Sequence, residues 1–330
     1  MPTTYIKGDK HKSFILGEDT ETFGKGTKLI IPTTPIFYDQ LRQEFQQSGS
    51  APKSQFLALK KYDASTNKNS FCGNKIVYQF YWEGLLATRY KGGKTLMETY
   101  DTDPAKYWER VCKMDRRKGF PPSVRDAYEL NKAITFFKPS TAKHLVERFT
   151  EPGAIVFDPC AGWGGRVLGT LSADRRYVGC DTNPRIKETL GEMLEAIGVD
   201  AQFAQINTCS CLDYIIPDDL NVDQFDFAFT SPPYSNLEVY EEMSPFVDDD
   251  DYYKNFLIPM ISQCLELVKS ASAVAINVSP KIYEKLTGHY GYPECQEKID
   301  FCQQMGQQSG KKADFVYVWR PFLTPEYGEQ

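Results

Sequence analysis

The stretch that decides the fold is AIVFDPCAGWGG, residues 154–165. It begins with four apolar residues, as a buried parallel strand does. Glycines follow at positions 162, 164 and 165, and they let the backbone approach a ligand closely. Ligands of open α/β sheets bind outside the carboxyl ends of strands, which is where Asp158 is expected. A tight strand-to-helix turn without a ligand fits the same residues, because a glycine-rich turn alone is weak evidence.

Strands and helices alternate on both sides of this stretch. A helix is expected up to Phe149, with Ser140 as its N-cap. Further helices are expected over Pro184–Ile197 and Tyr252–Lys269. The other strands are expected at Tyr177–Cys180, Ala201–Ile206, Phe225–Phe229, Ala273–Asn277 and Phe315–Trp319. Such alternation predicts an α/β layer with a mostly parallel sheet.

Residues 1–122 have a different pattern and are predicted to form a separate α+β extension. GFPP at residues 119–122 breaks the chain, so the second domain is expected over residues 123–330. The elements expected in the extension are a helix or strand at 54–62, strands at Lys75–Trp82 and Leu85–Tyr90, and a helix from Asp103-Pro104 to Met114.

Charge divides the chain in a similar way. The net charge of the 330 residues is -6, yet residues 1–150 carry 25 Lys and Arg against 16 Asp and Glu, a net +9. Residues 151–330 carry 13 against 28, a net −15. A basic half joined to an acidic half points to a polyanionic partner on the basic side, and ordinary surface charge explains it equally well.

Composition excludes several classes of protein. Apolar residues make up 41% and charged residues 25%, as in globular proteins. No apolar run is long enough to span a membrane and no signal peptide is visible, so a cytoplasmic protein without a membrane partner is expected. Nine cysteines with one close pair, Cys209 and Cys211, predict reduced thiols and no metal site.

An acid follows the second expected strand. Asp181 lies about 20 residues beyond the glycines, where an acid accepts hydrogen bonds from the ribose hydroxyls of a nucleoside. Thr182 and Asn183 come next. Asp181 as the cap of the helix that begins at Pro184 is the alternative, and both roles are compatible.

The fourth expected strand ends in Thr230-Ser231-Pro232-Pro233-Tyr234. Two prolines force the chain to turn rigidly and so fix the directions of the Ser231 hydroxyl and the Pro232 carbonyl. Both oxygens accept hydrogen bonds from an exocyclic amino group, and Tyr234 offers a flat face to a base. An ordinary loop is the alternative for this motif taken alone.

Together these motifs resemble those of the DNA adenine-N6 and cytosine-N4 amino-methyltransferases. That family's cofactor turn, Asp-Pro-Phe-x-Gly-x-Gly, is matched by Asp158 to Gly164 with Cys160 in place of Phe. Its catalytic motif is Asp, Asn or Ser, then Pro-Pro and an aromatic, as at Ser231 to Tyr234. FKPS at residues 137–140 resembles its methionine-side motif, and Phe315–Arg320 its final strand. The resemblance covers roughly residues 125–325.

The resemblance implies a Rossmann-like fold with a mostly parallel seven-stranded sheet, the cofactor S-adenosyl-L-methionine and no metal. It implies amino-group methylation of a flipped base by positioning. The implied catalytic residues are Ser231, Pro232, Pro233 and Tyr234. The implied cofactor-binding residues are Phe137, Lys138, Pro139, Asp158, Pro159, Cys160, Ala161, Gly162, Trp163, Gly164, Asp181, Thr182, Asn183, Ser210, Cys211 and Thr230.

The implied substrate is double-stranded DNA. Ser at the first catalytic position is commoner among the cytosine-N4 enzymes, so cytosine N4 is favoured over adenine N6. RNA as the substrate and a non-catalytic subunit of the same fold are alternatives, and a monomer or homodimer is expected.

Target recognition is expected in the basic first part of the chain. The predicted phosphate contacts are Arg89, Lys91, Lys113, Arg116, Arg117 and Lys118, with a solvated helix end as the alternative. The acidic run Asp248–Asp251 is expected to be a mobile loop near the catalytic turn.

Overall fold

The computed structural model describes residues 7–8, 11–12, 20–23, 27–30, 37–39, 41–43, 51–66, 70–90, 93–104, 136–235, 238–239, 245–301 and 314–321. The predicted boundary at 122 and the predicted helix beyond Pro104 lie outside these residues. The chain divides into two compact units. Residues 1–49 and 82–135 form one, and residues 50–81 and 136–330 form the other.

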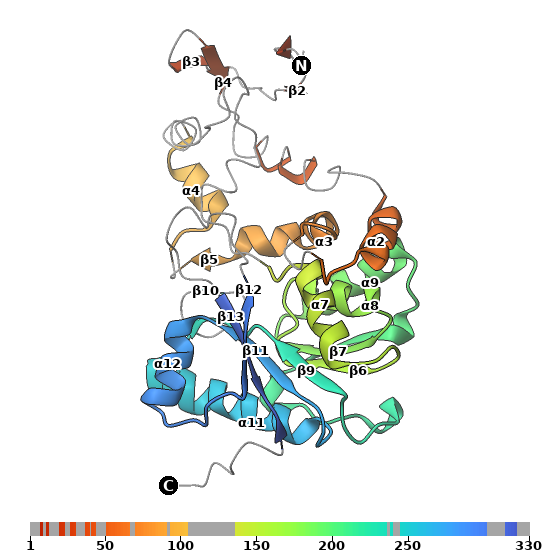
Figure 1. Ribbon diagram of the computed structural model, residues 1–330. Coiled ribbons are helices and arrows are strands. Elements are labelled where there is room, and N and C mark those ends of the chain that lie inside the picture. The colour runs from red at the N-terminus through yellow and green to blue at the C-terminus, as the bar shows by residue number, and fades with distance from the viewer. Residues whose placement is uncertain are drawn as a thin grey trace. The chain divides into compact units, whose positions relative to one another are not determined.

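A seven-stranded sheet lies at the centre of the second unit (Figure 1). Its order is β12-β13-β11-β9-β6-β7-β8, and β13 runs antiparallel to both neighbours while the pairs from β11 to β8 are parallel. This is the strand order 3-2-1-4-5-7-6 of the class I methyltransferase fold, so the predicted fold class is confirmed. The strands are β6 (Ile155–Asp158), β7 (Arg176–Asp181), β8 (Ala204–Thr208), β9 (Phe227–Thr230), β11 (Val274–Val278), β12 (Glu297–Phe301) and β13 (Asp314–Trp319).

Helices cover both faces of the sheet because its central strands are apolar on both sides. Phe157 packs in one core with residues of α11 (Ile258–Leu267) and α12 (Pro280–Gly288). Its neighbour Val156 packs in another with residues of α7 (Pro139–Phe149). The remaining long helices are α8 (Gly165–Ser172) and α9 (Pro184–Ile197).

Two elements of this unit escaped prediction, and one was placed wrongly. The strand β12, EKIDF, has charged residues at three of its five positions and lies at the sheet edge, and α12 was not expected. The helix predicted from Tyr252 begins earlier, as α10 (Asp249–Tyr252), and passes through a π-helical turn at Tyr253–Leu257 into α11.

The acidic run is therefore a helix N-terminus, and the predicted mobile loop is wrong. Asp248 is the N-cap and accepts a hydrogen bond from the Asp251 backbone N–H at 2.8 Å. Asp249 pairs with Lys285, and Asp250 pairs with Lys254. Negative charge at a helix N-terminus is favourable because it complements the helix dipole.

The predicted strands at 75–82 and 85–90 are also wrong. Residues 74–87 form a helix, α3 (Asn74–Ala87), and only Arg89–Tyr90 is extended, as β5. The fully or nearly buried residues recur in pairs four to five positions apart: Ile76 and Val77, Tyr81 and Trp82, Leu85 and Leu86. This spacing is helical and outweighs the β-branched and aromatic composition of the segment. Residues 52–61 likewise form a helix, α2 (Pro52–Lys61).

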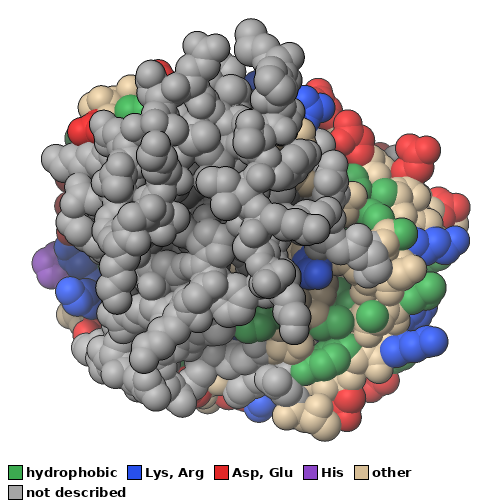
Figure 2. Space-filling model, turned by 90° about the horizontal axis from the view of Figure 1, so that it is seen from above, with side chains coloured by type: hydrophobic (Ala, Val, Ile, Leu, Met, Phe, Trp, Pro, Cys, Tyr) green, Lys and Arg blue, Asp and Glu red, His purple; other side chains and the backbone are tan. Residues whose placement is uncertain are grey.

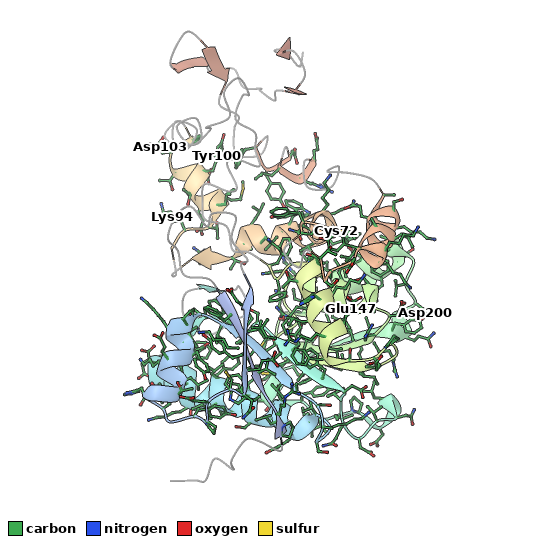
Figure 3. All side chains as sticks on the ribbon, viewed as in Figure 1. Cys72, Lys94, Tyr100, Asp103, Glu147 and Asp200 are labelled. Carbon is green, nitrogen blue, oxygen red and sulfur yellow. The ribbon has the colours of Figure 1, made fainter. Side chains whose placement is uncertain are left out.

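The described part of the first unit contains short strands and helices, as expected of an α+β extension. Strands β1 (Lys7–Gly8) and β2 (His11–Lys12) pair antiparallel, as do β3 (Thr20–Phe23) and β4 (Thr27–Ile30). Helix α4 (Leu96–Thr102) begins with a capping box formed by Thr95 and Glu98. Figure 3 labels Lys94, Tyr100 and Asp103 in and beside this helix. The Tyr100 ring stacks on Phe37, with ring centroids 3.7 Å apart.

Candidate active site

The turn between β6 and α8, residues 158–165, is here called the glycine turn. Gly162 and Gly164 have φ of +55° and +74°, conformations that L side chains rarely adopt. A Cβ atom at Gly165 would lie 1.8 Å from the Phe137 carbonyl oxygen. Glycine is therefore required at 162 and 164 by backbone conformation, and at 165 by the close approach of the chain.

The Asp158 side chain stabilises the glycine turn through hydrogen bonds. Its side chain is fully buried and accepts four hydrogen bonds. Oδ2 accepts from Arg166 Nε and from the Tyr177 hydroxyl, both at 2.7 Å. Oδ1 accepts from Thr230 Oγ1 at 2.7 Å and from the Cys160 backbone N–H at 3.3 Å. A carboxylate with four donors has little capacity left for a ligand, so its contribution is to hold the turn.

Arg166 completes this support. Its guanidinium forms an ion pair with Asp158 and donates to the carbonyl oxygens of Cys160 and Ala161. Both charged side chains are almost fully buried. The backbone N–H of Ala161 donates to the Cys180 carbonyl at 2.8 Å, which links the turn to β7.

Asp181, at the end of β7, is bonded differently. It is half-buried, and within the described residues it accepts two hydrogen bonds, from the Gly162 backbone N–H at 2.9 Å and the Asn183 N–H at 3.0 Å. The N-cap of α9 is Asn183, which accepts from the Arg185 N–H. Asp181 is thus not the helix cap. Burial raises the pKa of its carboxyl, and each oxygen keeps a lone pair for a hydroxyl donor.

Thiols gather beyond the ends of β6, β7 and β8. Cys211 lies in a short 3-10 helix capped by Ser210, whose Oγ accepts from the Leu212 N–H at 3.3 Å. A hydrogen bond with Cys211 and burial raise the pKa of the Cys160 thiol. Burial raises the pKa of Cys180 as well. The Cys160 and Cys180 thiols are therefore protonated, and no cluster of His, Cys, Asp and Glu in the described parts of the chain could hold a metal ion.

The turn after β9, Ser231–Tyr234, is here called the proline turn. The Ser231 hydroxyl and the Tyr234 hydroxyl each donate to Oδ1 of Asn277, both at 3.2 Å. The Tyr252 hydroxyl donates to the Pro233 carbonyl at 3.0 Å. Thr230, the last residue of β9 before the proline turn, donates to Asp158 at the start of the glycine turn.

The predicted methionine-side residues lie beside the glycine turn. Phe137 packs edge-on against Phe229 of β9, with centroids 5.0 Å apart. Lys138 is the N-cap of α7, so the predicted cap at Ser140 is wrong. The Ser140 hydroxyl instead donates to the Ser70 carbonyl. Burial lowers the pKa of Lys138, whose ammonium lies 4.6 Å from the centre of the Phe71 ring.

Two residues of this site were not predicted. Asn277, the first polar residue after an apolar run, lies at the carboxyl edge of the sheet, and that position was the signal for it. Tyr81 of α3 packs on the glycine turn: a Cβ at Gly164 would lie 2.4 Å from its ring, and its centroid is 6.5 Å from that of Trp163. Its buried hydroxyl has no hydrogen-bond partner among the described residues. Because residues 75–82 were predicted to form a strand, Tyr81 was not predicted to contact the glycine turn.

The predicted phosphate contacts are almost all outside the described residues; these are Lys91, Lys113, Arg116, Arg117 and Lys118. Arg89 is described, and it forms two hydrogen bonds of 2.6 Å with Glu98. On the described part of the face in Figure 2, basic, acidic and hydrophobic side chains are interspersed. None of the described helices has the length and apolar character needed to cross a membrane.

Comparisons with known proteins give only short or distant similarities. No family model matches it. It is 38% identical over 66 residues to "Putative methylase YubD" of Escherichia coli (strain K12), a match that covers 20% of this chain and 29% of that protein. The chain thus matches less than a third of that relative's length.

The chain also has low similarity to several solved structures. One is TrmN from Thermus thermophilus, with 16% identity, a TM-score of 0.38 and coverage of 55% of this chain and 48% of that one. Another is an RNA methyltransferase from Salinibacter ruber in complex with S-adenosyl-L-homocysteine, with 14% identity, a TM-score of 0.37 and coverage of 60% and 98%. Similarity at this level assigns neither a substrate nor a reaction.

Proposed function

We propose that this protein transfers a methyl group from S-adenosyl-L-methionine to the exocyclic amino group of a nucleic-acid base. The observation that carries the proposal is the 2.7 Å hydrogen bond from Thr230 to Asp158. It joins the residue before Ser231 to the acid that begins the glycine turn. A turn suited to a nucleoside cofactor and a turn suited to an amino group thus lie side by side at one edge of the sheet.

The residues present fit the cofactor. Gly162 and Gly164 adopt positive φ and place no side chain of their own on the glycine turn, and Asp181 offers two carboxylate oxygens to ribose hydroxyls. Ser210 and Cys211 lie beyond β8, where we expect the adenine. When bound, S-adenosyl-L-methionine supplies a methyl group that its sulfonium has already activated, so no covalent enzyme intermediate is needed.

The proline turn would hold the base whose amino group receives the methyl group. Ser231 Oγ and the Pro232 carbonyl would accept the two amino hydrogens, which draws the nitrogen lone pair out of the ring and toward the methyl carbon. Transfer would exchange the carbon–sulfur bond of the cofactor for a carbon–nitrogen bond, with a thioether as the leaving group, and the nitrogen would release one proton to solvent. Stacking on Tyr234 would contribute about 1–3 kcal/mol to holding the base.

The substrate we favour is double-stranded DNA with the target base flipped out, methylated on cytosine N4. The serine at position 231 supports cytosine over adenine N6, by resemblance to the amino-methyltransferases. The name of the Escherichia coli relative supports a methylase in general. The excess of Lys and Arg in residues 1–150 supports a polyanion as the partner.

Two measurements on the purified full chain test the proposal. Isothermal titration with S-adenosyl-L-homocysteine tests the cofactor, and tritiated methyl transfer to duplex DNA or RNA tests the reaction. We expect binding, and transfer that Ser231→Ala slows strongly, to a low but measurable rate, without weakening the binding. Ser262→Ala, which changes a half-buried serine of α11, is the control. Binding without transfer to either polymer would contradict the enzymatic proposal, and no binding would contradict both parts.

A further inference from the structure

We infer that Asn277 is a positioning residue that makes the Ser231 hydroxyl act only as a hydrogen-bond acceptor toward the substrate. The inference rests on the proposed function and assigns a residue outside both turns. Asn277 lies on β11, the parallel neighbour of β9. Since Ile276 pairs with Thr230, Asn277 lies level with Ser231, and it is only 3% exposed.

The orientation of the Asn277 amide is determined by its other contact. Nδ2 donates to the Phe315 carbonyl of β13 at 2.9 Å, so the amide nitrogen faces that strand. Oδ1 consequently faces the proline turn. An amide oxygen has no hydrogen to donate, and both hydroxyls within reach, those of Ser231 and Tyr234, must therefore be the donors.

The hydrogen bond to Asn277 uses the only hydrogen that the Ser231 side chain can donate. Its Oγ retains two lone pairs and no free hydrogen. The Pro232 carbonyl is also an acceptor, and no hydrogen bond to it is found within the described residues. The carbonyl of Pro233 is already bonded to Tyr252. Ser231 Oγ and the Pro232 carbonyl oxygen thus act as two acceptors, and neither has a hydrogen left to donate to a substrate.

Such a site selects for the chemistry of the base. An exocyclic amino group provides two hydrogens for two acceptors. A keto oxygen in the same place would face two oxygen lone pairs and leave all three groups unsatisfied, at a cost of the kind that gives strong discrimination. We therefore infer that the substrate class is amino-bearing bases, and that uracil, thymine and hypoxanthine are rejected at this position.

A double-mutant cycle tests the role of Asn277. Asn277→Leu removes the acceptor at similar volume and frees the Ser231 hydroxyl to rotate, and we expect kcat to fall by about tenfold. Affinity for S-adenosyl-L-homocysteine should not change. In a Ser231→Ala background the same substitution should have little further effect, because the hydroxyl it orients is absent. Independent, multiplying effects in a folded double variant would overturn the inference.

Asn277→Asp separates positioning from a merely structural role. It retains an acceptor for both hydroxyls but replaces the amide that donates to Phe315. We expect it to keep kcat within a few-fold of the wild type, whereas Asn277→Leu loses it. If Asn277→Asp, folded by near-ultraviolet circular dichroism, is as impaired as Asn277→Leu, the inference fails. If Asn277→Leu does not fold, the kcat of Asn277→Asp alone decides. Absence of transfer by the wild type would contradict the proposed function instead.

Discussion

Two aspartates end neighbouring strands of the same sheet, and their surroundings differ sharply. Asp158 at the end of β6 accepts hydrogen bonds from Arg166, Tyr177, Thr230 and the Cys160 backbone. Asp181 at the end of β7 accepts, among the residues that the structure describes, from two backbone N–H groups. The first acid is saturated and supports the site. Each carboxylate oxygen of Asp181 accepts one described hydrogen bond and can accept another. Two acids at equivalent strand ends can therefore differ in their capacity to bind a ligand, and sequence position alone does not reveal the difference.

The largest effect is expected from Asp158→Ala. Removing this carboxylate leaves the Arg166 guanidinium buried without its partner, which costs about 3–5 kcal/mol. Urea denaturation should report that loss in the free energy of unfolding, or the variant should fail to accumulate in soluble form. Asp223→Ala, at an exposed position of the same unit, is the matched control and should change stability little. A loss below about 1 kcal/mol at Asp158 would refute its supporting role.

Asp181→Asn should have the opposite profile. Losing the charged acceptor for ribose hydroxyls should weaken S-adenosyl-L-homocysteine binding by about 10- to 100-fold, since hydrogen bonds to charged groups contribute about 1.5–3 kcal/mol. The free energy of unfolding should fall by no more than about 1 kcal/mol. Titration calorimetry and urea denaturation measure the two quantities. Asp213→Asn, at an exposed acid after β8, should alter neither.

The comparison also predicts a pH dependence of binding. Burial raises the pKa of Asp181 above its ordinary value of 3.8. Its deprotonated form accepts from both ribose hydroxyls, so affinity should be full above that raised pKa and should decline as pH falls through it. Asp181→Asn has no group to protonate there and should show a flat profile over the same range. An equal decline in both proteins would assign the dependence to another group.

The two turns of this candidate site could be predicted from the sequence because each is encoded by one short, continuous stretch. A turn is predicted after the apolar run of β6, where DPCAGWGG follows. A second turn is predicted at the rigid Ser-Pro-Pro-Tyr. The partners of Asp158 could not be identified in this way, since Tyr177 and Thr230 are 19 and 72 residues away in the chain. Asn277 acquires its role only through the register of β11 with β9.

The errors in secondary structure have a related cause. Residues 75–82 have the composition of a strand, yet their helical burial period becomes visible only when the window extends to Leu86. Strand β12 is half charged because only one side of an edge strand has a neighbour, so it lacks the apolar run of the central strands.

The smallest effect is expected at two buried tyrosines, Tyr252 and Tyr81, which differ in the hydrogen bonding of their hydroxyls. Tyr252 donates to the Pro233 carbonyl, whereas the Tyr81 hydroxyl has no partner in the described structure. Tyr252→Phe should cost about 1 kcal/mol. Tyr81→Phe should leave the melting temperature unchanged or raise it, because it removes an unsatisfied buried group. Differential scanning calorimetry measures both, and a larger loss for Tyr81→Phe would show that its hydroxyl is bonded.

The most direct test of amino-group methylation is mass spectrometry of nucleosides from duplex DNA and from RNA incubated with the protein and S-adenosyl-L-methionine. We predict N4-methylcytosine in the DNA treated with the wild type and far less in DNA treated for the same time with Ser231→Ala. N6-methyladenine would keep the amino-transfer mechanism and change the base, and an N-methylated nucleoside in RNA alone would change the polymer. Nucleoside profiles that are identical for wild type and Ser231→Ala on both polymers would contradict the account.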